Sequence, residues 1–101
     1  MGINRAIASI LRDIPAGKIF DSHFVISQLI RHNSDAYFDY IRHTPGDTAS
    51  VHGLLSQEIA TFEPNFVFRH GPAWSENIHG TASECMSWEL VRHPPASLVS
   101  D

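Results

Sequence analysis

The sequence predicts a single α+β domain in which helices pack on a small antiparallel sheet with a C-terminal β-hairpin. Three observations lead to this fold class. Apolar residues recur with helical spacing through residues 3–62 and are interrupted by turn sequences. A short apolar stretch, residues 18–21, follows the first of these helices. Two runs in which apolar and polar residues alternate, 65–69 and 84–91, close the chain and are typical of strands.

The first helix is expected over residues 3–14. Its apolar side chains share one face: Ile3, Ile7, Ile10, Leu11 and Ile14. Pro15-Ala16-Gly17 ends the helix, because proline disfavours helical backbone at the residue before it and glycine permits a turn. Lys18-Ile19-Phe20 then predicts a brief strand.

Three further helices are expected in the centre of the chain. Ser22 is a plausible N-cap for the first, which has an apolar face made of Val25, Ile26, Leu29 and Ile30. Ser34 can cap a continuation in which four residues share a side: Ala36, Tyr37, Tyr40 and Ile41. Asp47 or Thr48 caps the last, and Pro64 stops it. The residues of this last helix expected to face inward are Val51, Leu54, Leu55, Ile59 and Phe62, and Gly53 is expected to permit close helix packing.

The C-terminal third should form two strands. Met86, Trp88 and Leu90 alternate with polar residues and are expected to face the core. Residues 70–83 between the strands are expected to form a long loop, and long loops in compact domains are more often functional or mobile. Residues 1–93 are therefore assigned to the domain and 94–101 to a flexible C-terminal tail.

Composition limits the class of protein. The chain has 101 residues, 43% of them hydrophobic, which suffices for one core without disulfides. Its single cysteine favours a reducing cytoplasm. Neither a secretory signal nor a run long enough to span a membrane is present, so a cytoplasmic protein with no membrane partner is expected. The formal net charge of −4 argues against strong non-specific binding to DNA.

The order and spacing of these elements resemble the winged helix-turn-helix superfamily over about residues 3–92. The stretch IFDSHFVISQLI resembles the strand and second helix of that fold. The stretch TASVHGLLSQEIATFE resembles its third, recognition-type helix. The two strands and the wing are resembled by FVFRHGPAWSENIHGTASECMSWELV. The resemblance implies a winged-helix-like fold and a module that binds double-stranded DNA or regulates transcription. Two features depart from the pattern. Residues 34–44 are inserted between the second and third helices, and the recognition-type helix exposes neither Arg nor Lys.

Nucleic-acid contacts are expected at two surfaces. On the recognition-type helix, Ser50, His52 and Gln57 offer groups that can pair with base edges. In the wing, Arg69 is expected to bind phosphate, and Trp74 either stacks on a base or folds back over the core. The remaining candidates in the wing are His70, Asn77 and His79.

The alternative function is a non-catalytic module for protein–protein interaction or dimerisation that does not bind DNA. The inserted segment carries apolar residues on more than one face of a helix, which leaves a surplus aromatic side chain. A homodimer interface is therefore expected at Tyr37, Phe38, Tyr40 and Ile41.

Enzymatic activity and cofactors are not expected. The sequence has no nucleophile elbow, no phosphate-binding loop and no zinc-protease motif. His70, His79 and Cys85 could contribute to a zinc site, but the short paired spacings of structural zinc sites do not occur. Whether these three residues bind a metal is left open by the sequence.

Overall fold

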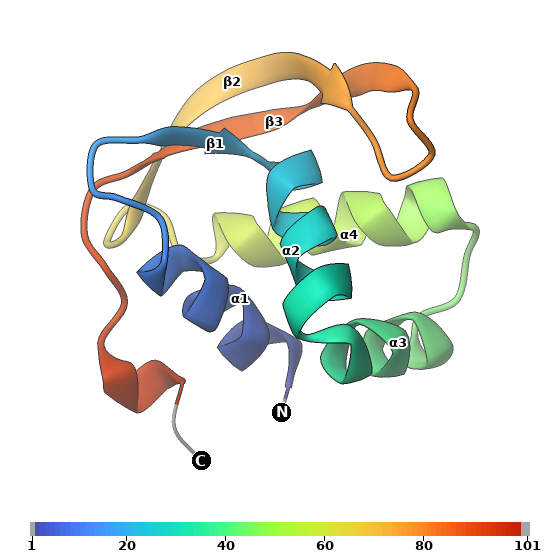
Figure 1. Ribbon diagram of the computed structural model, residues 1–101, viewed down its shortest axis with the longest axis horizontal. Coiled ribbons are helices and arrows are strands. Elements are labelled where there is room, and N and C mark those ends of the chain that lie inside the picture. Colours follow the sequence, from blue (N-terminus) through green and yellow to red (C-terminus); the bar gives the residue numbers. More distant parts are fainter. Residues whose placement is uncertain (1, 100–101) are drawn as a thin grey trace.

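The computed structural model describes residues 2–99 and confirms the α+β class, with helices packed on a small antiparallel sheet (Figure 1). Four helices and three strands occur in this part of the chain. In order they are α1 Ile3–Arg12, β1 Ile19–Asp21, α2 Ser22–His32, α3 Ser34–His43, α4 Thr48–Ala60, β2 Val67–Glu76 and β3 Ala82–Leu90, followed by a 3-10 turn at Ala96–Leu98. The first helix ends two residues earlier than expected, at Arg12.

Aspartates cap two of the helices. The Asp21 carboxylate accepts a hydrogen bond from the backbone N–H of Phe24, so Asp21, and not Ser22, is the N-cap of α2. The Asp47 carboxylate caps α4 in the same way by accepting from the N–H of Ser50. The expected cap at Ser34 is wrong, because α3 begins after Asn33 without a side-chain cap. Carboxylates suit these positions because they also interact favourably with the helix dipole.

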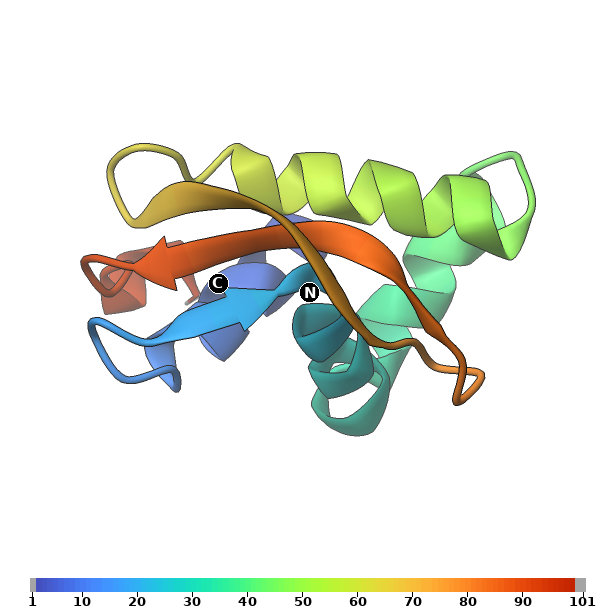
Figure 2. The ribbon, with the colours of Figure 1, turned by 90° about the horizontal axis from the view of Figure 1, so that it is seen from above.

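The three strands form one antiparallel sheet in the order β1-β3-β2. Seen from above, β3 lies between the other two strands and the helices lie beneath them (Figure 2). Trp88 in β3 stands opposite Phe20 on one side and Arg69 on the other. A shift in the register follows Arg69, and the pairing then resumes at Gly71.

The long loop expected over residues 70–83 is wrong. Strand β2 continues through Gly71 and Pro72 as far as Glu76, and β3 begins at Ala82, which leaves only residues 77–81 as the connection. Pro72 is tolerated because β2 is an edge strand, where one side of the backbone needs no partner. Figure 1 shows the connection bending toward α2 and α4, and this bend positions the site described below.

The core lies between the helices and the inner face of the sheet. Its largest fully buried side chain is Trp88, which stacks on Phe20 with ring centroids 6.0 Å apart. Leu90 is also fully buried, as expected, whereas Met86 is only half-buried against the core. In α4 the buried stripe is Val51, Leu55 and Ile59, so the expectation that Leu54 faces inward is wrong. Spacings of four residues keep that stripe on one side and turn Leu54 outward.

The chain beyond β3 returns to the helices. The backbone carbonyl of Pro94 accepts a hydrogen bond of 2.6 Å from Arg12, and Pro94 is fully buried. Val99 packs against the core. Flexibility of the segment 94–101 stays a prediction, and its residues 100–101 lie outside the described residues. Across residues 2–99, the helices are too short or too polar to cross a membrane.

Candidate functional site

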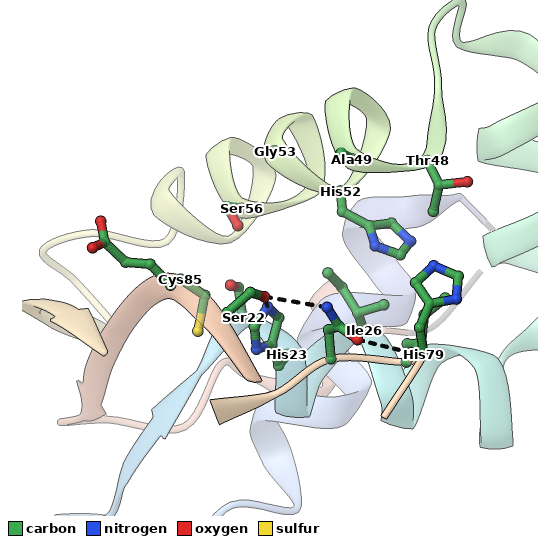
Figure 3. A pocket seen from close by; sticks show the side chains of 14 residues that line it. Ser22, His23, Ile26, Thr48, Ala49, His52, Gly53, Ser56, His79 and Cys85 are labelled. Carbon is green, nitrogen blue, oxygen red and sulfur yellow. Dashed lines mark hydrogen bonds between the residues drawn. The ribbon is translucent and has the colours of Figure 1, made fainter. Parts of the chain in front are cut away.

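A pocket of about 370 Å³ lies where the bent connection between β2 and β3 approaches the first turns of α2 and α4 (Figure 3). Helix α2 contributes His23, helix α4 contributes His52, and the connection contributes His79. Hydroxyl groups of Ser22, Thr48, Ser56 and Ser83 also line it. Three imidazoles from three separate elements therefore face one cavity.

The His23 side chain of α2 lies within hydrogen-bonding distance of both β2 and β3. Its Nδ1 lies 2.8 Å from the Oγ of Ser75 in β2, and its Nε2 lies 3.4 Å from the Oγ of Ser83 in β3. One imidazole thus joins a helix to both strands. Neither His23 nor the two serines were site candidates from the sequence, because the contacts span 52 and 60 residues and no local pattern signals them.

His52 is half-buried and held within the protein, and its expected contact with bases stays a prediction. Its Nε2 lies 2.7 Å from the hydroxyl of Tyr37 in α3. Burial, followed by the nearby His79 and His23, lowers the pKa of His52 from its ordinary value of 6.5. Burial also raises the pKa of Tyr37. His52 is therefore a neutral imidazole at pH 7, and Figure 3 shows it and His79 pointing toward one another.

Asn77 shapes the connection between the strands. Its Oδ1 accepts hydrogen bonds from the backbone N–H groups of His79 and Thr81, and its Nδ2 donates to Ser83 over 3.3 Å. Gly80 completes the turn with a φ of +78°, a conformation that favours glycine. The Asn77 side chain is engaged within the chain, and its expected contact with nucleic acid stays a prediction.

Arg69 and His70 are held by carboxylates. The Nε of Arg69 donates to Glu63 over 2.9 Å, and the same carboxylate oxygen accepts a hydrogen bond of 2.5 Å from the indole N–H of Trp88. His70 lies 3.1 Å from the carboxylate of Glu89 on the neighbouring strand. Arg69 and His70, two of the expected nucleic-acid contacts, therefore each have an acidic partner within the protein.

Six of the eight expected nucleic-acid contacts are exposed to solvent: Ser50, Gln57, Arg69, His70, Trp74 and His79. Trp74 is 71% exposed, so it does not fold back over the core. Ser50 and Gln57 lie on the exposed side of α4. Trp74 stands on β2, on the face of the β2–β3 pair that points away from the Ser75 and Ser83 hydroxyls, since successive side chains of a strand alternate.

The four residues of the expected dimer interface on α3 differ in exposure. Tyr37 is buried and contacts His52, while Tyr40 and Ile41 are half-buried against the core. The chain's own core therefore uses one of the four residues fully and two in part, and the dimer interface stays a prediction. Phe38 stays 54% exposed and makes an edge contact with Tyr37.

The described residues contain no group of three His, Cys, Asp or Glu side chains placed to hold a metal ion. Cys85 instead lies 3.7 Å from the hydroxyl of Ser75, and His70 lies within hydrogen-bonding distance of Glu89.

Gly53 in α4 is not required for helix packing, because a Cβ at this position would meet no atom within 4 Å. Its expected role in close helix packing is wrong.

Comparison of the chain with family models, curated proteins and solved structures gave no match.

Proposed function

We propose that the chain is a non-catalytic, winged-helix-like module that assembles with a second copy of itself and does not depend on DNA. Support for the winged-helix assignment comes from the order of the elements and from β1, which joins the two C-terminal strands in one small antiparallel sheet. In this assignment α4 is the recognition-type helix, β2 and β3 form the wing, and α3 is the inserted segment.

The observation that carries the proposal is an apolar surface on the outside of the sheet. Ile19 and Phe68 both stand opposite Glu89, one on each side of β3, so these residues share a face. Ile19 is 55% and Phe68 59% exposed, and the Phe68 ring makes an edge contact with His70. We call Ile19 and Phe68 the outer sheet face. Contiguous exposed apolar residues with an aromatic centre are typical of protein interfaces.

A second copy is a suitable partner for this face. A two-fold contact requires one patch that is complementary to itself. Here the apolar side chains surround His70 and Glu89, which carry opposite charges when His70 is protonated and can pair across such a contact as well as within the chain. Phenylalanine also contributes a large contact area at little cost in side-chain entropy.

The electrostatics of the wing argue against DNA recognition as the main role. Binding to DNA derives most of its non-specific affinity from free Lys and Arg side chains next to phosphates. Arg69 is paired with Glu63, α4 has neither Lys nor Arg, and the whole chain has a net charge of −4. Double-stranded DNA is kept as a second candidate because Trp74, Ser50 and Gln57 are exposed on the two surfaces that a winged helix presents.

Fluorescence anisotropy with a mixed-sequence duplex separates the two candidates. At about 50 mM salt, where phosphate contacts are strongest, we expect no saturable binding in the micromolar range. Saturable binding that weakens steeply with added salt and is lost in Trp74→Ser would favour the DNA module. Phe38→Ser is the matched control, because it removes an exposed aromatic residue from α3, away from the wing.

A further inference from the structure

The pocket beneath the β2–β3 connection carries donors that no part of the proposed assembly uses. Its imidazoles are provided by His23, His52 and His79, and its hydroxyls by side chains of α2, α4 and β3. The cavity, of about 370 Å³, also has apolar walls that include Ile26 and Ile78. Polar donors that converge in a partly apolar cavity are typical of a small-molecule site.

We propose that this pocket binds a small oxyanion, held between the imidazolium forms of His52 and His79 and by the surrounding hydroxyl groups. The two imidazoles approach the cavity from opposite sides, one from α4 and one from the connection (Figure 3). Each offers N–H donors when protonated, and hydroxyl groups donate to oxyanions as well. Apolar walls and spare volume allow the anion to be the charged end of a larger organic molecule.

The lack of a side chain at Gly53 fits this role. Glycine inside a helix is less favourable than alanine, and no neighbouring atom of the protein requires it here. Gly53 lines the pocket, so the space next to its Cα is open to a ligand. Packing within this chain does not explain why residue 53 is glycine. A molecule bound against α4 would explain it, because the molecule would occupy the space next to the Gly53 Cα.

Binding of an oxyanion should be coupled to uptake of a proton. Without a ligand, burial and the neighbouring imidazoles of His79 and His23 lower the pKa of His52 and keep it neutral. An anion favours the protonated form, raises the pKa of His52 and binds more tightly as pH falls. The other ionisable groups that face this site are Tyr37 on α3, which contacts His52, and Glu84 and Cys85 on β3, which line the same pocket. Because the pKa of His52 is lowered, affinity should be weakest at neutral pH and above.

The test uses sulfate, because it remains a dianion over the whole range in which histidine titrates. Histidine side-chain signals are followed by NMR while sodium sulfate replaces sodium chloride at constant ionic strength. We expect saturable shifts of His52 and His79, with a dissociation constant about tenfold lower at about pH 5.5 than at about pH 7.5, as proton linkage requires. His79→Asn should weaken sulfate binding about tenfold, since a charge-assisted hydrogen bond is lost.

His32→Asn is the control, because His32 is an exposed histidine outside this pocket. This variant should bind sulfate as the wild type does. The proposal is overturned if the wild-type shifts do not saturate, if the affinity is equal at both pH values, or if His79→Asn binds as tightly as the wild type. The wild-type titration decides the question even if a variant does not fold.

Discussion

Trp88→Ala is expected to lower the free energy of unfolding by about 3–5 kcal/mol, the range for removing a large buried aromatic side chain. Trp88 is fully buried, stacks on Phe20 and donates its indole N–H to Glu63. The substitution therefore leaves a cavity between the sheet and the helices and removes one of the hydrogen-bonding partners of a carboxylate. Urea unfolding followed by circular dichroism measures the change.

Trp74→Ala is the matched control for this variant. Trp74 is the same residue type on the same sheet, but it is 71% exposed. A surface substitution is expected to change stability by no more than about 0.5 kcal/mol. Equal destabilisation by the two variants would contradict the burial of Trp88 and with it the packing of the sheet on the helices.

Glu63→Ala is expected to destabilise the protein by about 1–3 kcal/mol, the cost of leaving a buried hydrogen-bond donor without a partner. One carboxylate oxygen of Glu63 accepts from both Trp88 and Arg69. Trp88 is fully buried, and Glu63 is the acceptor for its indole N–H. The same unfolding measurement tests this, and a loss below about 0.5 kcal/mol, the ordinary effect of a surface substitution, would show that the indole N–H does not need Glu63.

Glu63→Gln separates the two roles of this residue. The glutamine amide oxygen can still accept from Trp88, while the negative charge next to Arg69 is removed. Stability should change by less than about 1 kcal/mol, the value of an exposed ion pair. Arg69 would then be free to approach phosphate, so any weak DNA binding of the wild type should increase and its salt dependence should steepen.

The elements that the sequence predicts well are those with a local physical signal. Helix α1 follows from its apolar stripe and from Pro15, and Trp88 and Leu90 are buried as alternation in β3 indicates. Asp47 was one of two alternatives for the cap of α4, and its carboxylate takes that role. In each case residues a few positions apart determine the outcome.

The features that the sequence did not predict depend on contacts between distant residues. Gly71 and Pro72 indicate a loop by composition, yet β3 holds this segment in a strand through pairs such as Pro72 with Met86. His52 has the spacing of an exposed helix position, but α3 folds back so that Tyr37 covers it. Arg69 has a carboxylate partner only because the chain turns between α4 and β2.

The candidate site also depends on contacts between residues that are distant in the sequence. His52, Asn77 and His79 were expected to matter because of their residue types and their positions on two surfaces, and they do lie together. Their grouping around an inward-facing pocket with His23 depends on the bend of the β2–β3 connection over α2. No periodicity in the sequence encodes that bend.

Sedimentation equilibrium of the wild-type chain tests most directly whether the outer sheet face is an assembly surface. At roughly 100 µM chain, well above a micromolar dissociation constant, we expect a mass of two chains. Replacing Ile19 and Phe68 together by serine should return the mass to one chain, because both substitutions remove apolar contacts from that face. Phe38→Ser should leave the dimer intact. A wild-type mass of one chain at this concentration, or a dimer that only Phe38→Ser dissociates, would contradict the proposal.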